Sequence, residues 1–156
     1  MATNWLPYLE APLPVPDRIE RDLELPHPPE KVWHALTTSE GLGSWFGSRA
    51  EVDDLRPGGT VRMWWHEDGP YTLRIQLVDP HSRFVFTWPI EGLPPSDPRH
   101  TQVEFTLQPT PTGTRLTVVE TGFAQLPADL TEAYEGNVKG WAMELAELAE
   151  YLDAVA

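Results

Sequence analysis

The feature that most constrains this chain is an apolar stripe near its C-terminal end. Residues 137–152 read NVKGWAMELAELAEYL, in which large apolar side chains recur at intervals of three and four residues, at Val138, Trp141, Leu145, Leu148 and Leu152. This spacing places all five side chains on one face of a helix. Strand-like segments dominate the rest of the sequence, so the helix is expected to cover one face of a sheet. A curved sheet and a single helix need not close along their whole length, and any gap between them becomes an internal pocket.

Composition indicates one domain with a substantial core. The chain has 156 residues, which is the usual size of a single domain. Hydrophobic residues make up 40% of it and seven residues are Trp, so it can bury enough apolar surface to fold without a disulfide or a metal. There is no Cys, which excludes disulfides, thiolate catalysis and cysteine metal ligands.

Charge argues against two classes of partner. The chain carries 24 acidic and 11 basic residues, a formal net charge of -13, and the basic residues are spread along the sequence. Such a chain repels phosphate groups, so we expect it to bind neither nucleic acid nor membrane. The N-terminal residues lack the basic start and apolar run of a signal peptide, and no apolar run is long enough for a membrane helix. We therefore expect a cytoplasmic protein.

The first part of the predicted domain is a strand followed by two short helices. Residues 18–25 alternate apolar and charged side chains, which predicts a half-buried strand. Prolines suited to a helix start then precede a short helix over residues 29–37. Ser39 is expected to cap a second helical segment that presents Trp45 and Phe46.

The middle of the chain predicts an antiparallel meander. Turns rich in Pro and Gly are expected at residues 56–59, 67–70, 79–82 and 109–113, and a longer Pro-rich loop at 89–100 is expected to rim one end of the sheet. These segments separate six strands, predicted at residues 50–55, 60–66, 71–78, 83–88, 102–107 and 115–121.

Alternation assigns one face of each strand to the long helix. The side chains predicted to face inward are Val61, Met63, Trp65, Tyr71, Leu73, Ile75, Leu77, Phe84, Phe86, Trp88, Val103, Phe105, Leu107, Leu116 and Val118. Glu120 continues in phase with Val118, so a carboxylate also faces inward. Such a group is solvated at the strand end, paired with a basic side chain, or placed in a polar part of a cavity. The sequence leaves these three alternatives open.

Five segments together resemble a known family. They are PPEKVWHALTTSEGLGSWFG at 28–47, RPGG at 56–59, DPHSRFVFTW at 79–88, GTRLTVVETGF at 113–123 and GW at 140–141. Over about residues 17–152 the chain resembles the homologues of the activator of the heat-shock protein 90 ATPase (AHSA-like), in the START-like (SRPBCC) helix-grip superfamily. The resemblance implies an α+β helix-grip fold, a curved antiparallel β-sheet wrapped around a long C-terminal α-helix, with two short helices after the first strand. The predicted domain spans residues 17–156.

Residues 1–16 form a separate Pro-rich arm that the resemblance does not explain. The arm holds four prolines among isolated large apolar residues and shows neither a helical nor a strand period. It is either a frayed terminus or an extended strap that lays Trp5 and Tyr8 on a neighbouring surface, such as that of a second subunit.

We predict that a small hydrophobic or aromatic molecule binds between the sheet and the last helix. The wall expected there is aromatic with few polar points, so stacking and apolar burial would hold the ligand, and indole N–H groups or Glu120 would orient it. The same side chains could instead simply fill the core, and the sequence does not decide between the two. The expected ligand-binding residues are Trp45, Phe46, Met63, Trp65, Ile75, Phe86, Trp88, Phe105, Val118, Glu120, Trp141 and Leu145.

Two further functions stay open, because relatives within one fold differ in activity. The first is a co-chaperone-like protein-interaction domain linked to the stress response, which predicts an exposed apolar patch outside the grip. The second is a cyclase- or hydrolase-like enzyme, but the acid/base pair it would need, His66 with Glu120, is placed on opposite faces by alternation. No motif for catalysis, metal or cofactor binding is present, so no catalytic residue, metal or cofactor is expected. A homodimer and a chaperone are the expected protein partners.

Overall fold

A computed structural model describes residues 16–90, 93–94, 96–125 and 131–155. The helices are α2 (Pro29–Thr37), α3 (Ser39–Trp45) and α4 (Thr131–Ala154), with a short 3-10 helix η2 (Phe123–Gln125). The strands are β1 (Arg18–Leu25), β2 (Arg49–Asp53), β3 (Thr60–Trp65), β4 (Asp68–Asp79), β5 (Arg83–Pro89), β6 (His100–Thr110) and β7 (Gly113–Thr121).

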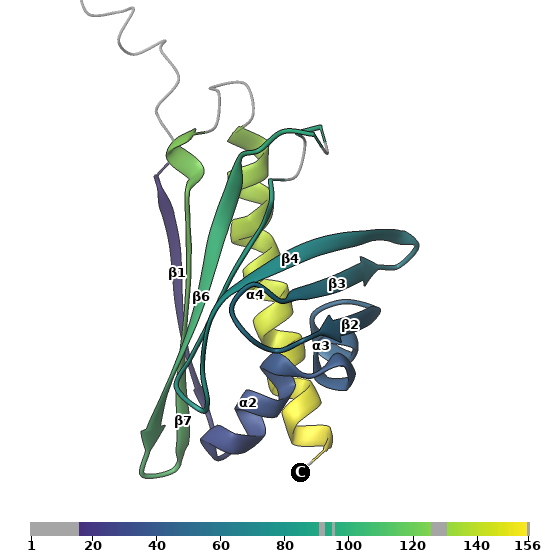
Figure 1. Ribbon diagram of the computed structural model, residues 1–156. Helices are drawn as coiled ribbons and strands as arrows, with labels where there is room; N and C mark the ends of the chain where they lie inside the picture. Colours follow the sequence, from purple (N-terminus) through teal and green to yellow (C-terminus); the bar gives the residue numbers. More distant parts are fainter. Residues whose placement is uncertain (1–15, 91–92, 95, 126–130, 156) are drawn as a thin grey trace, which may run out of the picture.

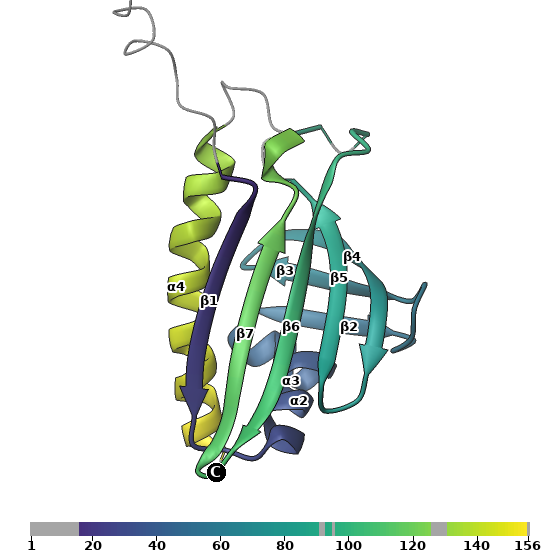
Figure 2. The same cartoon turned by 90° about the vertical axis from the view of Figure 1, so that its left-hand side faces the viewer.

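The seven strands form one curved sheet in the order β1-β7-β6-β5-β4-β3-β2. All six neighbouring pairs are antiparallel, and only β1 pairs with a strand distant in the sequence. α4 runs along the sheet, and α2 and α3 lie near its C-terminal half (Figure 1). Figure 2 shows β1, β7, β6 and β5 side by side, with α2 and α3 behind them. The helix-grip fold predicted from the sequence is confirmed.

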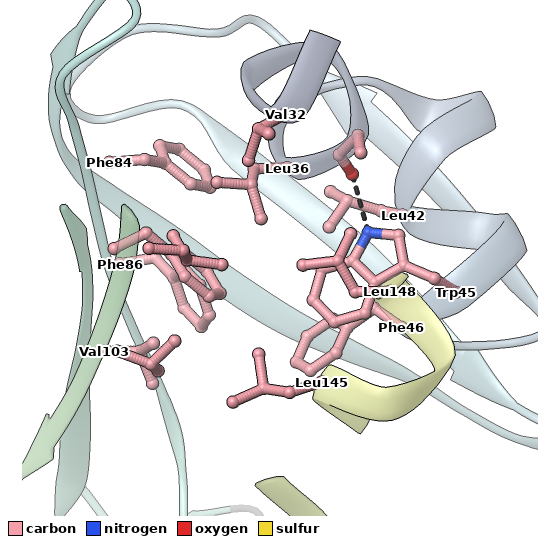
Figure 3. Close-up of a cluster of buried hydrophobic side chains, with 14 of the residues drawn as sticks. Val32, Leu36, Leu42, Trp45, Phe46, Phe84, Phe86, Val103, Leu145 and Leu148 are labelled. Carbon is pink, nitrogen blue, oxygen red and sulfur yellow. Dashed lines mark hydrogen bonds between the residues drawn. The ribbon is translucent and has the colours of Figure 1, made fainter. Parts of the chain in front are cut away.

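The predicted stripe on α4 forms one wall of the core. Trp141, Leu145, Leu148 and Leu152 are all buried. Figure 3 shows Leu145 and Leu148 among aromatic side chains that come from α3 and from the strands. Fully burying a side chain of this size stabilises the fold by roughly 1.5–3 kcal/mol relative to leaving it exposed, so the stripe fixes α4 on the sheet.

The C-terminal end of α4 is fastened to the segment that begins α2. Lys31 donates from Nζ to the carbonyl oxygen of Leu152 at 2.7 Å, where the free carbonyls of a helix end attract a cation. The Nε2 atom of His27 lies 2.8 Å from Oδ1 of Asp153. These contacts fix the C-terminal end of α4 to the start of α2.

The cap of α3 differs from the prediction. Thr38, not Ser39, is the N-cap residue, and its side chain accepts a hydrogen bond from the backbone N–H of Gly41 at 3.0 Å. Thr38 has the extended backbone that an N-cap requires, whereas Ser39 is already helical. The hydroxyl of Ser39 instead accepts from the N–H of Val52 at 2.9 Å, which joins α3 to β2.

The predicted inward position of Leu77 is wrong because β4 contains a bulge. Ile75 pairs with Phe86, but Leu77 pairs with Val85, so one extra residue lies between the two pairs. The extra residue reverses the alternation of faces. Val78 therefore packs against the core in place of Leu77.

Tyr71 is the second departure from the predicted faces. Its side chain is 44% exposed, although alternation predicts an inward position. The hairpin of β3 and β4 extends beyond the part of the sheet that α4 covers (Figure 1), so the outer end of the hairpin has no helix to pack against. The Tyr71 ring instead meets the edge of Trp65, with ring centroids 5.5 Å apart.

Two predicted element boundaries differ from those in the structure. α4 begins at Thr131, before the predicted start at residue 137, because Tyr134 extends the apolar stripe by a turn and packs edge-on against Phe123. The turn predicted at residues 67–70 is shorter, since β4 already begins at Asp68. The arm predicted over residues 1–16 lies outside the described residues, apart from Pro16.

Candidate functional site

Glu120 is completely buried beside the aromatic side chains of the grip. Its Oε1 accepts from the indole Nε1 of Trp141 and the amide Nδ2 of Asn137, both at 2.9 Å. Its Oε2 accepts from Nε1 of Trp88 at 2.7 Å, Oγ1 of Thr101 at 2.6 Å and the same Asn137 amide at 3.0 Å. All four donor side chains are uncharged, and both carboxylate oxygens are saturated.

Sheet register and helix periodicity bring these residues together. Glu120 pairs with Val103 of β6 and with Ile19 of β1, so it lies within a ladder rather than at a free strand end. Thr101 precedes Val103 by two residues, which places both on one face, and it pairs with Trp88 on β5. On α4 the two donors to Oε1 are four residues apart and therefore neighbours. The network joins three strands to the long helix.

Two of the three alternatives for Glu120 are excluded among the described residues. The carboxylate is not solvated, because its exposure is 0%. It also has no basic partner there, because each of its hydrogen bonds comes from an indole, an amide or a hydroxyl. The remaining alternative is a polar part of a cavity, and what the structure shows there is a carboxylate hydrogen-bonded to neutral donors beside packed aromatic rings.

Phe46 occupies the space beside the two indoles that bind Glu120. Its ring centroid lies 5.7 Å from that of Trp88 and 5.6 Å from that of Trp141, and it is tilted by 17° from each. The edge of Trp65 closes the group at 5.4 Å, and its indole Nε1 donates to the Phe46 carbonyl oxygen at 2.7 Å. In this structure aromatic rings fill the region where the sequence predicts a ligand.

The twelve predicted ligand-binding residues come together in one cluster. Ten are buried, and Trp65 and Trp88 are half-buried. Two clefts of about 320 and 310 Å³ lie on the surface, and none of the twelve lines either of them. A ligand that lies among these packed rings would have to take the place of one of them.

The indole N–H groups expected to bind a ligand are already bonded within the protein. Trp88 and Trp141 donate to Glu120, and Trp65 donates to Phe46. Trp45 donates to the carbonyl oxygen of Ala35 at 2.7 Å, the dashed line in Figure 3. Glu120 is therefore the polar group around which the aromatic cluster is organised.

Sequence reasoning missed two polar residues of the site, Thr101 and Asn137. Thr101 begins the strand face that continues with Val103, but a single threonine near a strand end carries no distinctive signal. Asn137 stands four residues before Trp141 and so interrupts the apolar face of α4 with an amide, which is a usable signal. Glu144 stands three residues after Trp141 and is a second polar interruption of the same face.

Glu144 carries an unpaired buried oxygen. Its Oε2 is buried and makes no hydrogen bond to any residue that the structure describes. Burial, reinforced by the nearby carboxylate of Glu147, raises the pKa of Glu144 from 4.5 to about 8. A half-buried carboxyl with an unpaired oxygen costs stability when it ionises.

Replacing Glu144 with glutamine is expected to stabilise the fold in a pH-dependent way. The folded state raises the pKa of Glu144, so below its unfolded pKa of 4.5 the carboxyl is neutral in both states and lowers stability little. As the pH rises toward 8, the unfolded state loses this proton first, and the folded state becomes less stable relative to it. The half-exposed side chain is partly screened by solvent, so we expect Glu144→Gln to gain about 1–2 kcal/mol at pH 8 and almost nothing near pH 4.5. Urea unfolding at both pH values measures the gain. The exposed Glu150→Gln is the matched control, and an equal gain in it would contradict this account.

The described residues contain neither the acid/base pair weighed for an enzyme, nor a metal-ligand cluster, nor a membrane-spanning helix. His66 is exposed in the β3–β4 turn, away from buried Glu120, so the acid/base pair weighed for an enzyme is not assembled. Across residues 16–90, 93–94, 96–125 and 131–155, no three His, Cys, Asp or Glu side chains group as metal ligands. Within the same residues, no helix combines the length and hydropathy needed to span a membrane.

The fold and the buried site define a helix-grip protein with an acidic group inside an aromatic core. A protein family described as "Activator of Hsp90 ATPase homolog 1-like protein" matches residues 26–153. The match covers most of the chain, so the protein belongs to this family. The resemblance noted from sequence motifs is confirmed. No curated protein matches the chain.

Solved structures with the same fold span almost the whole domain. Protein MLL2253 from Mesorhizobium loti is 28% identical with a TM-score of 0.74, and the match covers 89% of this chain and 98% of that one. Protein NE0264 from Nitrosomonas europaea is also 28% identical, with a TM-score of 0.71 and coverage of 92% and 100%. An Aha1 dimer from Colwellia psychrerythraea is 20% identical, with a TM-score of 0.70 and coverage of 86% and 95%, which shows a common fold.

Proposed function

We propose that this protein binds a small aromatic molecule bearing an N–H or O–H donor, between the sheet and α4, and that Glu120 accepts the donated hydrogen bond. One observation carries the proposal, which is the burial of Glu120 within an aromatic cluster without a cationic partner among the described residues. The helix-grip fold supports it, because the sheet and the helix meet at this cluster.

The energetic cost of burying Glu120 supports a functional role. Removing a carboxylate from water costs several kcal/mol, and apolar residues of similar volume would fill the same space without that cost. A core selected only for stability gains nothing from a buried carboxylate in place of an apolar side chain. A binding site does gain, because a buried acceptor distinguishes ligands that donate a hydrogen bond from ligands of the same shape that do not.

Phe46 is the side chain that a ligand would displace. It ends a short helix and is followed by Gly47, and its ring lies nearly parallel to two indoles, as a flat aromatic ligand would. Two hydrogen bonds hold the backbone of this residue, one from its N–H to the carbonyl oxygen of Leu42 and one from the indole Nε1 of Trp65 to its own carbonyl oxygen. Displacement of this ring is therefore expected to leave the backbone hydrogen bonds of α3 in place.

Asn137 is the donor that a ligand would replace on Glu120. Both carboxylate oxygens are saturated, so a new hydrogen bond requires the loss of an existing one. A single amide nitrogen of Asn137 is shared between the two oxygens, at 2.9 and 3.0 Å. Asn137 is half-buried, whereas Trp141 and Thr101 are buried. Its amide can therefore turn to solvent and form hydrogen bonds to water in place of those to Glu120.

Ligand binding is tested with paired compounds that differ in one donor. Phenol is titrated beside toluene, which has the same shape without the donor, with intrinsic Trp fluorescence and thermal melting as readouts; 2-phenylethanol and indole follow, and indole is read by thermal melting alone. We expect saturable quenching and a raised melting temperature, with the donor-bearing compounds binding about tenfold more tightly, because their donor forms a hydrogen bond to a charged acceptor, worth about 1.5–3 kcal/mol, while the displaced Asn137 amide bonds to water. Glu120→Gln should abolish this preference, and Glu104→Gln, a half-exposed carboxylate on β6, should preserve it. A failure of every compound to bind would overturn the proposal.

The protein-interaction alternative finds less support. Among the described residues the exposed large hydrophobic side chains are Tyr71, Met143 and Val155. They lie on the β3–β4 hairpin, in the middle of α4 and at the end of α4, so they form no continuous patch of the kind expected for a chaperone partner.

The proposal also includes a cytoplasmic location and self-association of the chain. The strongly acidic, Cys-free composition supports a place in the cytoplasm. The dimer of the Colwellia psychrerythraea relative supports self-association of this chain. Sedimentation velocity across a concentration series decides between a monomer and a dimer.

A further inference from the structure

We propose that residues 5–9 of the N-terminal arm, which read WLPYL, dock on an aromatic surface of the same chain. That surface, the aromatic rim, consists of Tyr71, Trp65 and Trp88. The arm lies outside the described residues, whereas the rim and the residues that precede β1 lie within them. Trp65 also contacts Phe46, so under the proposed function the docked arm would shield the ring that a ligand displaces. The docking itself needs no ligand and does not rest on that function.

The aromatic rim is a row of three rings with partly exposed faces. Tyr71 is 44% exposed, and Trp65 and Trp88 are half-buried. The ring centroid of Trp65 lies 5.5 Å from that of Tyr71 and 6.2 Å from that of Trp88. The β3–β4 hairpin, which carries the first two rings, extends beyond the part of the sheet that α4 covers (Figure 1). Neighbouring aromatic rings that reach the surface favour an apolar contact that removes them from water.

Sheet register places the residue before β1 level with one end of the rim. A continuous row of paired residues crosses β1, β7, β6 and β5, and its members are Arg18, Thr121, Gln102 and Thr87. Asp17 and Trp88 are each one residue beyond this row on the same side. They are therefore separated by three strand spacings, or about 14 Å. The other two rings of the rim are on β4 and β3, farther from β1 in the strand order.

Hydrogen bonds hold Asp17 at this edge of the sheet. Its carbonyl oxygen accepts from the backbone N–H of Gly122 at 3.1 Å and from that of Phe123 at 3.3 Å. Its Oδ1 accepts from the backbone N–H of Ala124 at 3.0 Å. The position from which the arm departs is therefore fixed by contacts to β7 and η2.

The arm is long enough to reach the whole rim. Tyr8 and Trp5 stand nine and twelve residues before Asp17. An extended Pro-rich chain advances about 3.1 Å per residue, so these side chains can reach about 28 and 37 Å from Asp17. Both values exceed the distance of about 14 Å to Trp88.

The composition of the arm suits an aromatic surface. Pro7 stands between the two aromatic residues of WLPYL, and three further prolines follow at Pro12, Pro14 and Pro16. Pro-rich segments bind aromatic-lined surfaces because their extended backbone is already formed and little entropy is lost. The arm carries a single charged side chain, Glu10, so its docking adds little repulsion in a chain with a net charge of -13.

A spin label on the full chain tests the docking without ligand. The chain contains no Cys, so Ala2→Cys takes a single nitroxide label. We expect the label to broaden the indole N–H signals of Trp65 and Trp88 in a ¹H–¹⁵N NMR spectrum. The signal of Trp33 should keep its intensity, because Trp33 packs against Phe84 at the opposite end of β5.

Two variants of the labelled chain decide the outcome. Adding Trp5→Ala and Tyr8→Ala together should abolish the broadening, and Leu13→Ala, a control within the same arm, should preserve it. No broadening, or equal broadening with and without the two aromatic residues, would overturn the inference. Broadening only in a mixture of spin-labelled and ¹⁵N-labelled chains would assign the arm to a second copy and overturn docking within one chain. None of these outcomes bears on the proposed function, since no ligand is present.

Discussion

Replacing Glu120 with alanine is expected to lower the free energy of unfolding by about 3–5 kcal/mol, although it removes a buried charge. The carboxylate is the acceptor for two indoles, an amide and a hydroxyl, and the substitution leaves the buried donors Trp141 and Thr101 without this acceptor, while Trp88 keeps a hydrogen bond to Thr101 at 2.8 Å. Each buried unsatisfied donor costs about 1–3 kcal/mol, and solvation of the half-buried Asn137 recovers part of the total. Urea denaturation followed by far-UV circular dichroism measures the change.

The control for this prediction is Glu104→Ala. Glu104 is half-exposed on β6 and pairs with Arg83 at 3.1 Å, so its loss should cost less than about 1 kcal/mol. If Glu120→Ala is as stable as the unmodified chain, then the hydrogen bonds do not offset the desolvation of the carboxylate. The hydrogen-bond network would then add no net stability to the fold.

Replacing Phe46 with alanine is expected to cost about 3–5 kcal/mol in stability and to strengthen ligand binding. The ring is only 2% exposed and packs against Trp88 and Trp141, so its removal creates a cavity beside the two indoles that hold Glu120. A ligand no longer has to displace the ring, and its affinity should rise by about tenfold or more. Calorimetric titration with indole and toluene, together with denaturation, measures both effects.

Phe84→Ala is the matched cavity control. Phe84 is also buried, and its ring packs against Trp33, Phe86 and Phe105 rather than against the indoles bonded to Glu120. Its loss should cost a similar amount of stability, and the resulting cavity should not favour indole over toluene. Equal behaviour of the two variants would mean that Phe46 is an ordinary core residue and that its position beside Glu120 has no bearing on binding.

Local patterns were sufficient for most of the fold. The stripe from Trp141 to Leu152 defines α4, and the alternation in β1 and β7 defines strands whose bounds match the structure closely. The errors arise where tertiary structure overrides a pattern. The bulge in β4 that turns Leu77 outward depends on the pairing of two strands, and the exposure of Tyr71 depends on how far α4 reaches along the sheet.

The sequence predicts the apolar residues of the cluster and Glu120, but not the hydrogen-bond partners of Glu120. Apolar side chains reveal their face through alternation, which is why the predicted lining residues share one cluster. Glu120 was noticed because it continues an inward-facing pattern. The partners of its carboxylate come from β5, β6 and α4, and no spacing within the sequence connects these elements. Phe46 shows the same limit, since a sequence cannot tell whether an aromatic residue lines a cavity or fills it.

The most direct test of ligand binding by the Glu120 cluster is the response of the seven indole N–H signals in a ¹H–¹⁵N NMR titration with indole. Trp88 and Trp141 donate to Glu120 and Trp65 donates to Phe46, whereas half-exposed Trp64 lies under the Arg49 guanidinium. We expect the first three signals to shift together and saturate while that of Trp64 stays in place. Absence of any shift, or a shift confined to Trp64, would contradict a binding site between the sheet and α4.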